Sequence, residues 1–177
     1  MSSVDLERRA SVELRTVGRK LEGHAAVFNS PATIGSFTET VLPGAFRSTL
    51  IGKPDVLALV DHDPGRLLAR TRAGTLRLAE DSRGLSFSLD LPDTTLGRDV
   101  LALAERGDLG GMSFGFRVQD EAWPARDKRE LRAVELIEVS VVHAFPAYSQ
   151  TSVSARARAM GRQEAAARLR RLRLLAL

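Results

Sequence analysis

A single serine lies near the middle of the chain, in a short alternating run that could carry nucleophilic chemistry. Read as a β-strand, the run places Met112, Phe114 and Phe116 on one face and Ser113 and Gly115 on the other. The aromatic face predicts a buried core. The serine face, with a glycine beside the hydroxyl, could receive an extended peptide. The alternative is an ordinary core strand that is entered through a glycine-rich turn at residues 110–111.

A serine hydroxyl is a weak nucleophile at neutral pH and needs a positioned base, which a third group orients. The chain has three histidines to supply that base. His62 follows the apolar run 56–60, where the end of a strand can expose an imidazole. His24 lies within a predicted strand among small residues, which favours a structural role. His143 follows the last predicted strand.

Glu138 is the candidate for the third group. It lies inside an apolar strand, where a carboxylate costs stability unless it has a partner. Strand alternation from Val134 to Val142 places Glu138 and Ser140 on one face and His143 on the other, unless a bulge intervenes. Glu138 and His143 are therefore competing candidates for the third position.

Residues 111–115 also match the G-x-S-x-G pattern of the nucleophile elbow. That motif needs a strand before the serine and a helix after it. Here a helix is predicted before Ser113 and a strand after it, with no alternation of strands and helices around them. We therefore reject this interpretation.

The composition is that of a globular protein of 177 residues, with 44% hydrophobic and 27% charged residues. The absence of cysteine excludes disulfides, thiolate metal sites and a cysteine nucleophile. We expect no cofactor and no metal. No apolar run approaches the roughly 20 residues of a membrane span, and residues 1–15 lack the apolar core of a signal peptide. We therefore expect an intracellular protein with no membrane partner.

The pattern predicts a mainly β fold with flanking helices (α+β), arranged as a strongly bent sheet or a β-barrel with one central helix and a C-terminal helix. A helix is predicted at 94–106, capped by Asp93 or Thr94 and stopped by Gly107. A helical turn is expected at 45–50, a turn at 64–65 and a polar excursion at 121–130. Strands are expected at 12–16, 20–28, 37–42, 56–60, 67–71, 75–80, 85–91 and 131–142.

This pattern and the distribution of charge along the chain predict three segments. They are a flexible leader at 1–10, a serine protease domain at 11–154 and a basic helical tail at 155–177. The formal net charge is +4, but the tail has seven arginines against Glu164, so the rest of the chain is close to neutral. Charge is the sole feature of the tail that favours nucleic acid, because no aromatic residues interleave the arginines. We expect no nucleic-acid partner.

Several segments, in this order, resemble the prohead maturation proteases of tailed phages, a family similar to the herpesvirus assemblins. The resemblance spans roughly residues 12–153. The matching segments are 21–28, 41–46, His62 with Asp63, 112–116, 136–142 and 146–147.

The resemblance implies an assemblin-like β fold in which Ser113 is the nucleophile, His62 the general base and Glu138 the third member. His143 remains the alternative third member, because the assemblins have a second histidine in that position of the triad. It also implies a serine endopeptidase that acts inside the assembling prohead, in the cytoplasm of the bacterial host. Its substrates would be scaffold, the N-terminal segment of the major capsid protein, and the protease itself. A homodimer is expected.

A second interpretation assigns the chain to another class of protein, one without enzymatic activity. The chain could be a non-catalytic capsid-assembly or scaffolding module that uses the basic tail as its binding arm. The two interpretations differ in whether Ser113 reacts.

Overall fold

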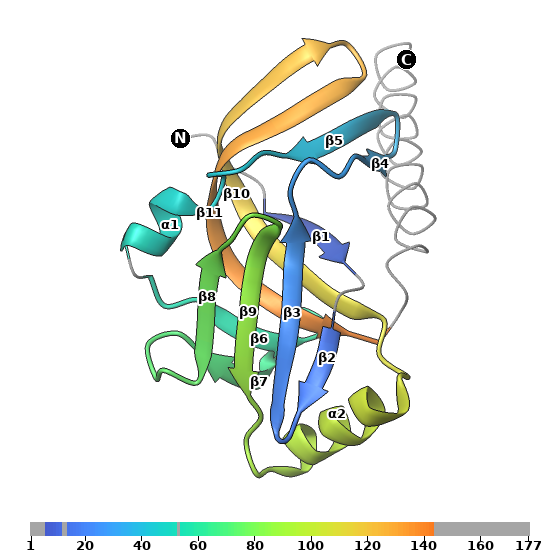
Figure 1. Ribbon diagram of the computed structural model, residues 1–177, viewed down its shortest axis with the longest axis vertical. Coiled ribbons are helices and arrows are strands. Elements are labelled where there is room, and N and C mark those ends of the chain that lie inside the picture. Colours follow the sequence, from blue (N-terminus) through green and yellow to red (C-terminus); the bar gives the residue numbers. More distant parts are fainter. Residues whose placement is uncertain (1–5, 12–13, 53, 144–177) are drawn as a thin grey trace, which may run out of the picture.

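The protein is mainly β, and its strands form two open sheets accompanied by two α-helices in the part described (Figure 1). The computed structural model describes residues 6–11, 14–52 and 54–143. The predicted fold class, mainly β with helices, is confirmed. Among the described strands neither sheet closes on itself, so these strands form no barrel, which was one expectation. The expected C-terminal helix and the tail at 155–177 lie outside the described residues.

The larger sheet is built on a long hairpin of β10 (Gly111–Ala125) and β11 (Lys128–Val142). The polar excursion predicted at 121–130 is wrong, because β10 continues to Ala125 and β11 begins at Lys128. Residues 121–130 show no alternation of apolar and polar side chains, because most side chains on both faces of this end of the hairpin are exposed. The hairpin therefore supplies two long neighbouring strands.

Four further strands complete the larger sheet beyond β11. β5 (Phe37–Val41) pairs in parallel with the start of β11, and β6 (Leu57–Val60) pairs in parallel with its end. β4 (Ala32–Ile34) pairs with β5, and β7 (Asp63–Arg70) pairs with β6. β11 is thus flanked along its length by elements that are distant in sequence.

β1 (Glu7–Ser11) forms the edge of the larger sheet beside β10. Residues 7–10 therefore belong to a strand, although they fall in the leader expected at 1–10. Their sequence, Glu-Arg-Arg-Ala, shows no apolar alternation. The partners that hold this strand lie on β5, β10 and β11, so the local sequence gives no sign of it.

The smaller sheet has four antiparallel strands in the order β2-β3-β9-β8. It covers one face of the larger sheet (Figure 1), and its apolar side chains join the same hydrophobic core. The strands are β2 (Leu14–Val17), β3 (Lys20–Val27), β8 (Leu76–Glu80) and β9 (Gly84–Asp90).

The core between the sheets buries the aromatic face of β10. Met112, Phe114 and Phe116 are all at most 2% exposed, as the alternation of this run predicts. The Phe46 ring packs edge-on against Phe114, with ring centroids 5.5 Å apart. Ser113 and Gly115 consequently project from the opposite face of the strand.

Helix α2 (Thr95–Arg106) begins and ends at the residues that the sequence indicates. The Thr94 hydroxyl accepts a hydrogen bond from the Gly97 amide at 3.2 Å, which satisfies one of the free donors of the first turn. Gly107 ends the helix with a φ of 74°, a conformation that glycine adopts without steric cost. The helix lies at one end of the smaller sheet (Figure 1).

Helix α1 (Arg47–Gly52) holds the middle of β11 through one buried hydroxyl. Thr49 Oγ1 donates to the Val134 carbonyl at 2.8 Å and accepts from the Leu136 amide at 3.0 Å. These bonds satisfy main-chain groups of β11 next to an irregularity in its pairing with β10.

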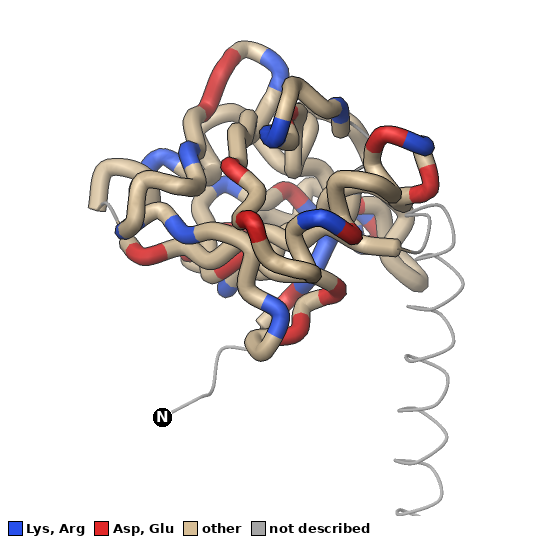
Figure 2. The backbone as a smooth tube through the Cα atoms, turned by 90° about the horizontal axis from the view of Figure 1, so that it is seen from below, with Lys and Arg blue, Asp and Glu red and all other residues tan. Residues whose placement is uncertain are grey.

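Acidic and basic residues are both spread over the described body (Figure 2), in keeping with a nearly neutral chain outside the tail. None of the helices in the described ranges is both long and apolar enough to cross a membrane.

Candidate active site

Ser113 and Glu138 lie on neighbouring strands, on the face opposite to the aromatic core. Ser113 of β10 pairs with Ser140 of β11, and Gly115 pairs with Glu138. Directly paired residues share a face of the sheet, so Ser113 and Glu138 project on the same side. Both are nearly buried, at 2% and 4% exposure.

A β-bulge at Ile137 sets the direction of Glu138. Phe116 pairs with Leu136 whereas Gly115 pairs with Glu138, which leaves Ile137 as the extra residue of β11. Leu136 and Val139 therefore both face the core, and Glu138 faces away from it. The uniform alternation that the sequence suggested, with Leu136 and Glu138 on one face, is wrong because of this bulge.

Gly115 leaves the space that the Glu138 carboxylate fills. A methyl group added at Gly115 would lie 2.4 Å from Glu138 Oε1 and 3.0 Å from its carboxyl carbon, closer than real contacts allow. The glycine is therefore needed at this place for room rather than for backbone freedom.

His62 occupies a tight turn between β6 and β7. Val60 pairs with Asp63, so the two-residue loop is Asp61-His62, and both have positive φ values of 51° and 62°. Positive φ at both positions is the geometry of a type I′ hairpin turn. The turn expected at 64–65 is instead part of β7, because the chain has already reversed at His62.

Asp61 ties this turn to the end of β11. Its Oδ1 accepts the main-chain amide of His143 at 3.0 Å, and its Oδ2 lies 2.6 Å from His143 Nδ1 and 3.1 Å from Arg66 Nη1. Burial would raise the pKa of Asp61, but the bonds from His143 and the charge of Arg66 lower it overall. The carboxylate is therefore held in its charged, accepting form.

The imidazole of His62 reaches the Glu138 carboxylate. His62 Nδ1 lies 2.6 Å from Glu138 Oε1, and the Ser140 hydroxyl donates to Glu138 Oε2. The Arg8 guanidinium lies 3.7 Å from Oε1. A buried carboxylate needs such partners. In the neutral tautomer that donates from Nδ1 to Glu138, Nε2 carries the lone pair that a general base requires.

The Ser113 hydroxyl bonds to β1 rather than to His62. Ser113 Oγ donates to the main-chain carbonyl of Arg9 at 2.7 Å. In the described part of the chain we find no hydrogen bond between Ser113 and His62. The nucleophile candidate and the histidine–carboxylate pair thus lie on one face, with the serine engaged by a strand.

The other two histidines have different partners. His143 contacts Asp61, and no described contact joins it to His62 or Glu138. His24 Nε2 lies 2.8 Å from Asp81 Oδ2. That bond, with the amides of Arg83 and Gly84, lowers the pKa of Asp81 to about 2. This contact joins β3 to the residue that follows β8, and the structural role favoured for His24 stays a prediction.

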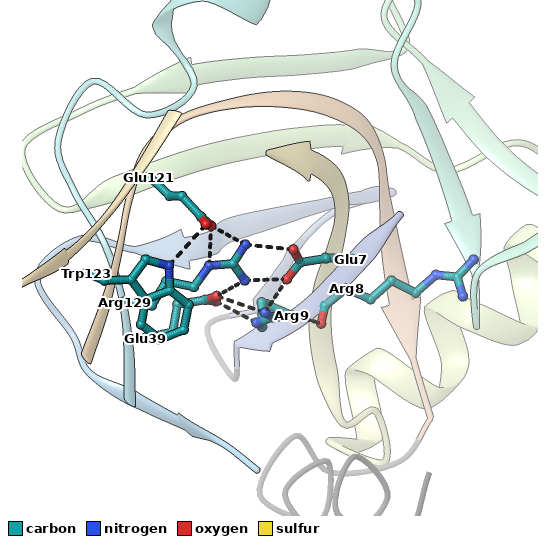
Figure 3. A network of polar contacts seen from close by, with 7 residues as sticks. All are labelled: Glu7, Arg8, Arg9, Glu39, Glu121, Trp123 and Arg129. Atoms are coloured by element: carbon teal, nitrogen blue, oxygen red, sulfur yellow. Dashed lines mark hydrogen bonds and ion pairs between the residues drawn. The ribbon is translucent and has the colours of Figure 1, made fainter. Parts of the chain in front are cut away.

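Sequence reasoning assigned no role to Asp61 or to the residues that surround β1 (Figure 3), and it placed Ser140 on the face of Glu138 without giving it a role. Ser140 was detectable in principle, because it alternates with Glu138 in an apolar strand. Asp61 gave no signal apart from its place beside His62. Glu39, which binds Arg9, gave none, because the two residues are 30 positions apart. In the described ranges no group of three or more His, Asp or Glu side chains is placed to hold a metal ion.

The fold is mainly β, and one face of its larger sheet carries a nearly buried serine and a carboxylate that contacts a histidine. This arrangement suits the class of serine peptidases. The family model of the caudovirus prohead serine proteases matches residues 5–165. The chain belongs to this family, as the resemblance in its sequence indicated, and it is a serine peptidase of capsid maturation.

Among solved structures, the bacteriophage T4 capsid assembly protease is similar to this chain. The TM-score is 0.58 at 9% sequence identity, and the match covers 78% of this chain and 97% of the T4 protein. At this identity the likeness concerns the fold. A search of curated proteins found no match.

Proposed function

We propose that the chain is the serine endopeptidase of prohead maturation in which Ser113 is the nucleophile, His62 the general base and Glu138 the group that orients His62. The observation that carries this proposal is the 2.6 Å contact between His62 Nδ1 and Glu138 Oε1 on the face of the sheet that bears Ser113. The contact of His143 with Asp61 favours Glu138 over His143 as the third member.

The reaction is acyl transfer to Ser113 and then to water. His62 Nε2 takes the Ser113 proton as Oγ bonds to the scissile carbonyl carbon, and the carbonyl electrons move onto oxygen. The C–N bond then breaks as His62 gives its proton to the leaving amine. Water, deprotonated by His62, attacks the acyl carbon, and the ester bond to Ser113 breaks with return of the proton. Glu138 stabilises the imidazolium in both halves.

The substrates that fit this role are scaffold, the N-terminal segment of the major capsid protein, and the protease itself. The site of action is the interior of the assembling prohead. A homodimer remains our expectation, which light scattering during size-exclusion chromatography tests. A monomer at all working concentrations would contradict it.

The test of the catalytic assignment is a fluorophosphonate probe together with processing of co-expressed capsid protein. The probe should label Ser113, and Ser113→Ala should abolish both labelling and processing. Ser86→Ala is the matched control, because Ser86 also lies on a strand and donates to a main-chain carbonyl, that of Ala79. Continued processing by Ser113→Ala would refute the assignment of Ser113 as the nucleophile, whereas a wild-type chain that neither takes the probe nor processes capsid protein would favour the non-catalytic assembly module.

A further inference from the structure

Two histidine–carboxylate pairs join the same two segments of the chain, and the pairs cross. The turn after β6 carries Asp61 and His62, whereas Glu138 lies in β11 and His143 follows its last residue. His62 Nδ1 lies 2.6 Å from Glu138 Oε1, and His143 Nδ1 lies 2.6 Å from Asp61 Oδ2. Each segment therefore supplies one carboxylate and one imidazole. The first pair belongs to the proposed catalytic group, and the second has no part in the reaction described above.

The Asp61 carboxylate continues the pairing of β6 with β11 into the turn. The parallel register ends with Val60 opposite Val141. In a regular parallel ladder the Asp61 amide would next donate to the Val141 carbonyl, and the His143 amide would donate to the Asp61 carbonyl. The first bond is present at 2.9 Å. In the second, the His143 amide donates to Asp61 Oδ1 at 3.0 Å, so a side-chain oxygen replaces the main-chain acceptor where the chain reverses.

The backbone of this turn needs support from its surroundings. Asp61 and His62 have φ values of 51° and 62°, a region that few residues other than glycine adopt, although aspartate and histidine do so more often than most. Such backbone persists where neighbouring groups determine it. Asp61 provides this support through His143 and through Arg66 Nη1, which lies 3.1 Å from Oδ2. The place of the His62 imidazole therefore depends on the carboxylate beside it.

The two pairs differ in their exposure to solvent. The side chains of His62 and Glu138 are 19% and 5% exposed, whereas those of His143 and Asp61 are 39% and 40% exposed. Exposed ion pairs contribute little to the free energy of unfolding. Removal of the Asp61 carboxylate should therefore change the position of His62 more than it changes the stability of the whole protein.

We infer that Asp61 is a positioning residue for the reaction. Its carboxylate, held by the amide and the imidazole of His143, fixes the turn so that His62 meets Glu138. This inference rests on the proposed function, because it concerns the same histidine. His143 then acts through Asp61 and touches no reacting group.

The test uses the full chain and a fluorophosphonate probe, which reacts with Ser113 when His62 activates the hydroxyl. Asp61→Gly removes the carboxylate, and glycine keeps the positive φ without steric cost. The maximal labelling rate should fall by about 10-fold to 100-fold, because a displacement of about 1 Å at a catalytic group can cost that much. The probe concentration that gives half of the maximal rate should not change. Asp61→Asn keeps an acceptor oxygen for the His143 amide and should recover most of the rate.

Asn29→Gly is the matched control, because Asn29 is an exposed residue outside the site with a φ of 55°. This variant should be labelled at the wild-type rate. Urea unfolding of the same variants measures their stability. An unchanged rate in Asp61→Gly, equal losses in Asp61→Gly and Asp61→Asn, or a loss explained by unfolded protein would overturn the inference.

The role of His143 is tested by combining two changes, since residues that act through one another have non-additive effects. His143→Ala should lower the labelling rate less than Asp61→Gly does, because the His143 amide still donates to Asp61 Oδ1. The double variant should match Asp61→Gly alone. A fold-loss in the double variant equal to the product of the two single losses would show that His143 acts independently, which contradicts the inference.

Hydrogen exchange separates this inference from the catalytic assignment. The amide of residue 61, which donates to the Val141 carbonyl, should exchange faster in Asp61→Gly than in the wild-type chain. If wild-type Ser113 takes no probe, the catalytic assignment fails, and faster exchange still supports Asp61 as the residue that holds the turn. Unchanged exchange would overturn the inference whatever the probe does.

Discussion

His62 Nδ1 lies 2.6 Å from Glu138 Oε1, although 76 positions separate the two residues in the chain. The contact depends on two local departures from regular structure, the hairpin turn at Asp61-His62 and the bulge at Ile137. The turn carries the imidazole beyond the end of β6, and the bulge turns the carboxylate away from the core.

Glu138→Gln should lower kcat for peptide cleavage by roughly 10⁴-fold, the loss known for a serine protease in which the carboxylate behind the catalytic histidine becomes an amide. The amide keeps the shape of the side chain but no longer stabilises the imidazolium. His143→Ala should cause a smaller loss, which arises through Asp61. Steady-state kinetics on both variants provide the measurement. A severe effect confined to His143→Ala would make His143 the third member.

Ser140→Ala should destabilise the protein by about 1–3 kcal/mol, because a buried carboxylate loses one of its hydrogen-bond donors. It should also lower kcat more than it changes KM, since the carboxylate would be less firmly placed. Urea unfolding and kinetics measure the two effects. Ser86→Ala, on the half-buried outer face of β9, serves as the control. An equal loss of stability in both variants would argue against a special role for Ser140.

Gly115→Ala should disturb Glu138 directly, because the added methyl group would lie 2.4 Å from Oε1. Overpacking of this kind costs about 1–3 kcal/mol, and the displaced carboxylate should lower kcat. Gly52→Ala is the matched control, since no atom lies within 4 Å of the methyl group it would add. Full activity of Gly115→Ala would show that the carboxylate position is not critical.

The stability of the fold should fall as the pH drops from about 4 toward 2, in part through Asp81. Its pKa is lowered from 3.8 to about 2 by the bond to His24 and by the amides of Arg83 and Gly84. A carboxyl group whose pKa is lowered in the folded state stabilises that state at pH values above the ordinary pKa of the group. This contribution disappears as the pH falls and the carboxylate becomes protonated. Asp81→Asn should flatten this part of the curve, as measured by urea unfolding at several pH values. An unchanged slope would contradict the prediction.

The sequence by itself determined the features that depend on short-range periodicity. Alternation identified the buried face of Met112, Phe114 and Phe116, and the cap at Thr94 and the glycine at Gly107 marked both ends of α2. These signals are readable because side chains repeat every two residues in a strand and every 3.6 in a helix. The order of segments around Ser113 also indicated the family.

The tertiary structure alone decided how these parts meet. A bulge reverses the side on which every later residue of a strand projects, and Ile137 shows no local sign of one. β1 likewise lacks an apolar pattern, because its attachment depends on Glu39 and Arg129 from distant strands. Ser113 and His62 could therefore be named as candidates from the sequence. Only the tertiary structure joined Glu138 to His62, through the bulge at Ile137 and the turn at Asp61-His62, and placed the Arg9 carbonyl beside Ser113.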